Sequence, residues 1–206
     1  MNLLTVICSR NPTKDLIDCL EGIKQFYPDA DIAIIDSDSD ATEVYRSVDV
    51  PVHYLKNKNY ELGAWKLAYE LYGDYDAYLC IQDTLIPQNR LPVETLCCDQ
   101  VMSYFNMTGF KYDDLADLAI ELTEDTIYHD VVSKHRISED FRLATHNSFL
   151  IPNGKLSYLI NALPNLPVDK RGSMAYERIL GLAITQSVGS VIRMNHSFNK
   201  RHGSRQ

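Results

Sequence analysis

The chain has 206 residues, of which 45% are apolar and 23% are charged. These proportions are typical of a globular protein and exclude a disordered, collagen-like, coiled-coil or disulfide-scaffold chain. The 20 basic and 28 acidic side chains give a net charge of −8, which disfavours binding to nucleic-acid phosphates, so we expect no nucleic-acid partner.

The five cysteines form no metal-binding or redox motif, because two are adjacent and no Cys-x-x-Cys spacing occurs. Free thiols are typical of a reducing compartment, so we expect a cytoplasmic protein of the producing or host cell. We see no signal peptide, and no apolar run approaches the roughly 18 residues of a transmembrane helix, so we expect no transmembrane segment. Without a convincing linker, we expect one domain over residues 1–206.

The first part of the chain alternates between β-rich apolar runs and helical periodicity. We predict strands at Leu3–Cys8, Asp31–Ile35, Val50–Leu55 and Ala77–Ile81. Between them we predict a helix from the N-cap Thr13 to Pro28, a short helix at Ala41–Ser47 and an amphipathic helix at Tyr60–Leu71. This alternation predicts an α/β fold with a parallel sheet.

The second part of the chain is less regular. We predict helices at Val93–Phe105, Asp113–Leu122, Leu156–Leu163 and Met174–Thr185, and strands at Ser148–Ile151 and Ser190–Met194.

Polar side chains follow each of the first four predicted strands. They are Ser9 and Arg10, then Asp36 and Asp38, then Asn57 and Asn59, then Gln82 and Asp83. Ligands of parallel α/β sheets bind at the carboxyl ends of the strands. We therefore expect a ligand site at this edge of the sheet.

The acidic cluster Asp36–Asp40 has three interpretations. It is a turn capped by its own side chains, or the nucleophile motif of a haloacid-dehalogenase-like phosphatase with Asp36 as nucleophile and Asp38 as acid. The third interpretation is the acid that contacts the nucleotide in glycosyltransferases. No Gly-rich phosphate loop occurs, which excludes dinucleotide dehydrogenases and P-loop NTPases as first choices.

Four segments resemble, in order and spacing, the GT-A-fold nucleotide-sugar glycosyltransferases, especially small viral (chlorella-virus-like) and bacterial surface-glycan transferases. They are Val6–Arg10, the IIDSDSD run that ends at Asp40, Asn59–Ala64, and Tyr78–Asp83. The resemblance implies a single-domain, Rossmann-like GT-A fold with a mostly parallel, mixed central sheet flanked by helices. It also implies a nucleotide-sugar-binding half at residues 1–90 and an acceptor-binding and catalytic half at residues 91–206.

The resemblance implies a divalent cation, Mn²⁺ or Mg²⁺, bound at the end of the fourth strand. The family usually carries Asp-x-Asp there, whereas this chain has Ile81-Gln82-Asp83, so Asp83 is the remaining acid. Mg²⁺ often uses one or two carboxylates together with phosphate oxygens and water. His196, which follows the last predicted strand, is the second expected ligand.

The segment Ser173-Met-Ala-Tyr-Glu-Arg resembles the part of the family that carries the general base of inverting enzymes. Glu177 is then the expected base, which deprotonates the acceptor hydroxyl. Asp140, in the run Ser138-Glu-Asp, is the second candidate.

The remaining predicted binding residues surround the donor and the acceptor. Ser9 and Arg10 flank the nucleoside, and Asp36 and Asp38 face its base and ribose. The sugar, the phosphates and the acceptor are assigned to Asn59, Lys66, Gln82, Lys170, Arg178, Lys200 and Arg201, the last two as a mobile basic lid.

The predicted reaction is transfer of a sugar from a nucleotide diphosphate, UDP by default, to a hydroxyl of a glycan or glycoconjugate. The haloacid-dehalogenase-like phosphatase and a related nucleotidyltransferase are the enzymatic alternatives. The third alternative is a non-catalytic module that binds a nucleotide or a glycan. It is favoured by Ile81 and Arg178, which stand where the glycosyltransferase family usually has acids.

Overall fold

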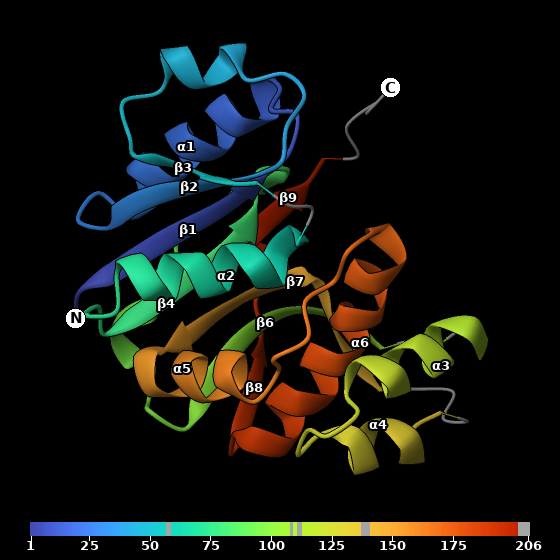
Figure 1. The fold of residues 1–206 in the computed structure, drawn as a ribbon. Helices are drawn as coiled ribbons and strands as arrows, with labels where there is room; N and C mark the ends of the chain where they lie inside the picture. The colour runs from blue at the N-terminus through green and yellow to red at the C-terminus, as the bar shows by residue number, and fades with distance from the viewer. Residues whose placement is uncertain (57–58, 108, 111–112, 137–140, 202–206) are drawn as a thin grey trace.

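The computed structural model describes residues 1–56, 59–107, 109–110, 113–136 and 141–201. The described residues form a seven-stranded sheet in the order β3-β2-β1-β4-β7-β6-β8 and a two-stranded sheet of β5 and β9 (Figure 1). In the larger sheet, β7 is antiparallel to both of its neighbours, β4 and β6, and the other neighbouring strands are parallel. The predicted mostly parallel, mixed sheet is confirmed.

The bounds of the elements follow the chain. The strands are β1 (Leu3–Ser9), β2 (Asp31–Ser37), β3 (Val52–Leu55), β4 (Ala77–Gln82), β5 (Leu85–Pro87), β6 (Gln100–Met107), β7 (Arg142–Pro152), β8 (Ser190–Arg193) and β9 (Phe198–Lys200). The α-helices are α1 (Lys14–Phe26), α2 (Tyr60–Leu71), α3 (Asp113–Leu122), α4 (His129–Lys134), α5 (Asn153–Asn161) and α6 (Lys170–Ser187). Three short 3₁₀ helices are η1 (Glu43–Ser47), η2 (Val93–Thr95) and η3 (Asn195–Ser197).

The strands and helices predicted for the first part of the chain are confirmed within about two residues. The N-cap of α1 is Thr13, whose hydroxyl accepts a hydrogen bond from the Asp15 backbone N–H at 3.2 Å. Such a bond satisfies one of the donors that every helix leaves free at its first turn. A local sequence signal therefore marks where α1 begins.

The predicted helix at Val93–Phe105 is wrong. The segment forms the short 3₁₀ helix η2 and then strand β6, which lies between β7 and β8. Val101 and Met102 are both buried but pack into different core clusters, one on each face of the sheet. A strand that is buried on both faces shows no alternation of polar and apolar residues, so its sequence does not distinguish it from a helix.

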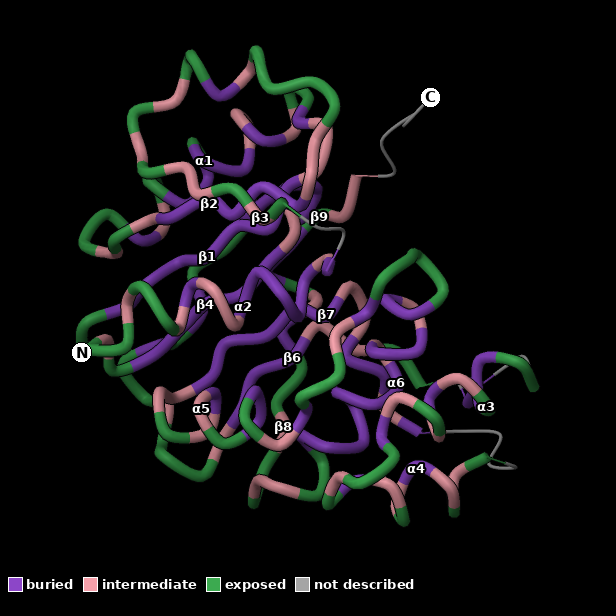
Figure 2. The backbone as a smooth tube through the Cα atoms, viewed as in Figure 1, coloured by how far each residue is buried: buried purple, intermediate pink, exposed green. Residues whose placement is uncertain are grey.

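Helices cover both faces of the sheet. Helix α1 packs on one face, and α2, α5 and α6 pack on the other, with α3 and α4 against α6 (Figure 1). Figure 2 shows the buried residues concentrated along the central strands and the inner faces of these helices. Among the described residues, no helix is long and apolar enough to cross a membrane.

Gly181 allows α6 to pack closely on β7. A Cβ at this position would lie 1.9 Å from the backbone oxygen of Arg142, a distance that neither backbone can accommodate without shifting. In contrast, a Cβ at Gly154, in α5, would have no neighbouring atom within 4 Å.

We expect the Gly181→Ala variant to lose about 2–3 kcal/mol of unfolding free energy, because overpacking forces the helix away from the strand. The Gly154→Ala variant is the matched control and should keep its stability or gain slightly, since alanine is the better helix former. Urea unfolding of both variants measures the difference. Equal midpoints for the two variants would contradict the close packing of α6 on β7.

Candidate functional site

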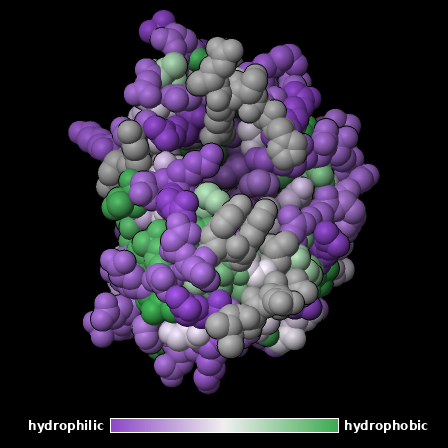
Figure 3. Space-filling model, turned by 90° about the vertical axis from the view of Figure 1, so that its right-hand side faces the viewer, coloured by the Kyte–Doolittle hydropathy of each residue, from purple (hydrophilic) through white to green (hydrophobic). Residues whose placement is uncertain are grey.

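A polar cavity of about 540 Å³ lies at the carboxyl ends of β1, β2 and β4. Residues from the first turns of α2 and α6 line it, together with Lys200 of β9 and the next residue, Arg201. Figure 3 shows that this side of the molecule is largely hydrophilic around a central recess. The cavity therefore lies at the edge where the sequence predicts a ligand.

Seven of the predicted site residues line this cavity. They are Ser9, Arg10, Gln82, Lys170, Glu177, Lys200 and Arg201. Seven other predicted residues do not line it: Asp36, Asp38, Asn59, Lys66, Asp83, Arg178 and His196. Asp140 lies outside the described residues.

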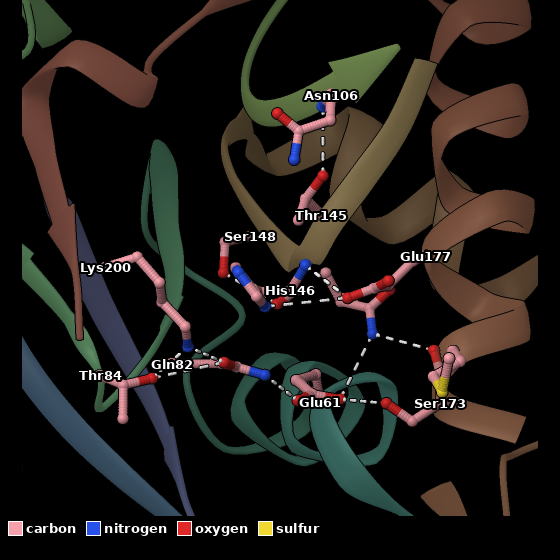
Figure 4. A network of polar contacts seen from close by, with 12 residues as sticks. Glu61, Gln82, Thr84, Asn106, Thr145, His146, Ser148, Ser173, Glu177 and Lys200 are labelled. Carbon is pink, nitrogen blue, oxygen red and sulfur yellow. Dashed lines mark hydrogen bonds and ion pairs between the residues drawn. The ribbon is translucent and has the colours of Figure 1, made fainter. Parts of the chain in front are cut away.

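Glu61 connects the elements around the cavity. This buried carboxylate accepts hydrogen bonds from Gln82 Nε2, from Asn147 Nδ2 at 3.3 Å and from Ser173 Oγ at 2.8 Å (Figure 4). A buried charge is tolerated when several hydrogen bonds replace its hydration. Glu61 is not among the residues predicted from the sequence, although an acid in the first turn of a helix that follows a predicted ligand loop is a detectable signal.

Glu177 projects into the cavity from α6 and faces β7. Its Oε1 accepts a hydrogen bond from the His146 backbone N–H at 2.7 Å, and the His146 Nδ1 lies 3.8 Å from the same oxygen. The guanidinium of Arg178 lies 3.4 Å from Oε2. Figure 4 shows Glu177 and His146 facing each other from α6 and β7.

An irregularity in β7 presents the His146 N–H to Glu177. His146 and the next residue, Asn147, have φ angles of 58° and 47°, which non-glycine residues rarely adopt. The pairing of β7 with β6 shifts register opposite them, as in a β-bulge. His146 is not among the residues predicted from the sequence, and no sequence signal marks the bulge.

Burial raises the pKa of Glu177 from 4.5 to about 7, and the charge of Glu61 adds to this effect. The His146 N–H, Arg178 and Lys200 act in the opposite direction. A carboxylate with a pKa near 7 accepts a proton readily at neutral pH and is suited to general base catalysis.

Asp36 has a structural role in its loop. Its Oδ1 accepts the Ser39 backbone N–H at 2.9 Å, and its Oδ2 accepts the hydroxyls of Tyr45, at 2.5 Å, and of Ser39. The carboxylate is buried under Tyr45, whose pKa is raised by burial and by this hydrogen bond. The capped-turn interpretation of the acidic cluster is favoured, and a phosphatase with Asp36 as nucleophile is not.

The residues at the end of β4 do not fit a divalent metal site. Ile81 packs in the core on the α1 side of the sheet. Asp83 is buried, accepts a hydrogen bond from Ser9 Oγ at 2.7 Å and contributes to the raised pKa of the buried Cys19 thiol on α1. His196 is exposed on η3, outside the cavity lining. The described residues contain no group of three histidine, cysteine or acidic side chains that could hold a metal.

Three other predicted binding residues have protein contacts of their own. The Lys66 Nζ lies 3.5 Å from the backbone oxygen of Pro164. Asn59 occupies the N-cap position of α2, where its backbone oxygen accepts the Gly63 N–H at 3.1 Å. The buried Arg178 donates to the Met174 oxygen at 2.7 Å. Arg178 therefore supports the helix that carries Glu177.

The expected mobile lid is different in the structure. Lys200 is the last residue of β9, and Arg201 forms ion pairs with Asp15 and Asp18 of α1. These contacts attach the two basic residues to the body of the protein.

No protein-family model and no curated protein matches the sequence. Among solved structures, TarS residues 1–349 from S. aureus has a TM-score of 0.52 and 10% identity, with 96% of this chain and 59% of that chain covered. The mannosyltransferase PcManGT from Pyrobaculum calidifontis, in complex with GDP-Man and Mn²⁺, has a TM-score of 0.55 and 9% identity, with 99% and 58% covered. The chain thus spans less than two thirds of the length of either structure, and it has the GT-A-like α/β fold that they share.

Proposed function

We propose that the protein is a glycosyltransferase that moves a sugar from a nucleotide-diphosphate donor to a hydroxyl of a glycan. The observation that carries this proposal is Glu177, a carboxylate whose pKa is raised to about 7, in a polar cavity at the carboxyl edge of a GT-A-like sheet. UDP is the expected nucleotide, and the complex of the mannosyltransferase with GDP-Man makes GDP the first alternative to test.

The charges that line the cavity suit an anionic ligand. Three basic side chains of the lining, those of Arg10, Lys170 and Lys200, face two carboxylates, those of Glu61 and Glu177. The fourth, Arg201, is already paired with Asp15 and Asp18. Arg10 also lies 5.9 Å from the centre of the Tyr60 ring, at the side of the cavity formed by β1 and α2. We assign the nucleoside to this side and the diphosphate to the basic residues.

The proposed reaction is a single displacement at the anomeric carbon. The acceptor oxygen forms a bond to this carbon as the bond from the carbon to the diphosphate oxygen breaks. The electron pair of the broken bond goes to the diphosphate, and the proton of the acceptor hydroxyl goes to Glu177. A single displacement inverts the anomeric configuration, so the product is expected to have the configuration opposite to that of the donor.

We expect Glu177→Gln to lower turnover about 10²–10⁴-fold, because the amide cannot accept the proton. In the unmodified protein, kcat/KM should fall as the pH decreases below about 7, the pKa of Glu177. Release of nucleoside diphosphate from UDP-, dTDP- and GDP-sugars, tested with a panel of glycan acceptors, measures both effects.

The exposed Glu121 of α3 provides the control for this test, and Glu121→Gln should leave turnover unchanged. Full activity of Glu177→Gln would refute the assignment of the base. Binding of a nucleotide sugar without turnover under any condition would instead favour the non-catalytic binding module.

The raised pKa of Glu177 also predicts how stability depends on pH. Between pH 4.5 and 7 the folded protein holds a proton that the unfolded chain has released, so stability decreases as pH rises through this window. Glutamine does not ionise, so Glu177→Gln removes this decrease in the free energy of unfolding. At pH 8 the variant should be more stable than the parent by up to about 3 kcal/mol. At pH 4 the two should be nearly equal.

Urea unfolding at pH 4, 6 and 8 measures this difference between variant and parent. Parallel stability profiles for the two proteins would show that Glu177 has an ordinary pKa in the folded state.

A further inference from the structure

A lysine lies at the point of the sheet where the resemblance to glycosyltransferases predicts an acidic metal motif. Lys200 Nζ donates hydrogen bonds to Gln82 Oε1, at 2.7 Å, and to Thr84 Oγ1 (Figure 4). Gln82 is the last residue of β4, and all three side chains line the 540 Å³ cavity. The strand end thus presents an ammonium group and neutral oxygens to the cavity, and Asp83 is directed to Ser9.

The backbone around Lys200 is fixed by several contacts. Strand β9 pairs with β5, with Lys200 opposite Leu85. The next residue, Arg201, donates its backbone N–H to the Thr84 oxygen at 2.9 Å and forms an ion pair with Asp15 at 3.1 Å. A charge held in place in this way needs little reorganisation to stabilise an anion.

The amide of Gln82 is oriented by contacts at both ends. Its nitrogen donates to the buried Glu61, so its oxygen is directed to Lys200. A neutral amide oxygen attracts a divalent cation less strongly than a carboxylate does. Because this oxygen also faces Lys200, the residue type and its orientation both favour a bound ammonium group.

We propose that Lys200, in the place of a divalent metal ion, binds the diphosphate of the donor, so that donor binding requires no metal. This inference rests on the proposed function of the same cavity. As the bond between the anomeric carbon and the diphosphate oxygen breaks, the electron pair passes to the diphosphate. The ammonium of Lys200 then balances the added negative charge and keeps its own protons. Thr84 and Gln82 act as positioning residues for the lysine.

The experiment is calorimetric titration of the full chain with UDP, dTDP and GDP, each with a chelator and with Mn²⁺. We expect one nucleoside diphosphate to bind in the presence of the chelator with nearly the same affinity as with Mn²⁺. Lys200→Met should weaken this binding roughly 10–100-fold, as for loss of a charged hydrogen bond. Lys200→Arg should retain most of the affinity.

Two controls separate a loss of charge at the site from a loss of structure. Lys24→Met removes a surface charge that pairs with Asp49 at the far end of α1, and it should bind like the parent. The matching nucleoside, which has no phosphates, should bind the parent and Lys200→Met equally well, which also shows that the variant is folded.

The outcomes separate this inference from the proposed function. Binding that appears only with Mn²⁺, or that survives unchanged in Lys200→Met, would overturn the role of Lys200 and leave the glycosyltransferase proposal in place. No binding of any of the three diphosphates, with or without Mn²⁺, would overturn both.

Discussion

The buried carboxylate of Glu61 is the interaction on which the rest of the site depends. Burying a charge costs several kcal/mol unless hydrogen bonds replace the lost water, and Glu61 has three donors from three different elements. Ser173 belongs to the first turn of α6, four residues before Glu177. Gln82 donates to Glu61 through its amide nitrogen and accepts a hydrogen bond from Lys200 through its amide oxygen. One carboxylate thus orients both the proposed base and the proposed diphosphate site.

The bulge in β7 is the second constraint, and its neighbours compensate for its strain. Two consecutive residues in the left-handed region cost of order 1–3 kcal/mol each. The backbone oxygen of Asn147 accepts a hydrogen bond from the buried Trp65 indole at 3.0 Å, and its side chain donates to Glu61. Contacts from α2 therefore hold β7 in the conformation that offers the His146 N–H to Glu177.

The sequence predicted the positions of residues better than the directions of their side chains. Alternating strands and helices were enough to predict the sheet and its ligand-binding edge, where Ser9, Gln82, Glu177 and Lys200 meet. Whether a side chain at this edge faces the cavity depends on hydrogen bonds between segments far apart in sequence. Asp36 accepts hydrogen bonds from Ser39 and Tyr45 and does not line the cavity. Glu61 stands in the first turn of α2, and this position does not predict its hydrogen bonds to residues of β4, β7 and α6.

Lys200 and Glu177 are also coupled electrostatically, which links the two halves of the proposed reaction. The positive charge of Lys200 lowers the pKa of Glu177, in opposition to the effect of burial. A diphosphate bound to Lys200 would offset this charge, and the carboxylate would then bind a proton more strongly. In the proposed mechanism Glu177 is therefore a stronger base when the donor is in place. The reason is that the ammonium of Lys200, which binds the leaving diphosphate, also affects the pKa of Glu177.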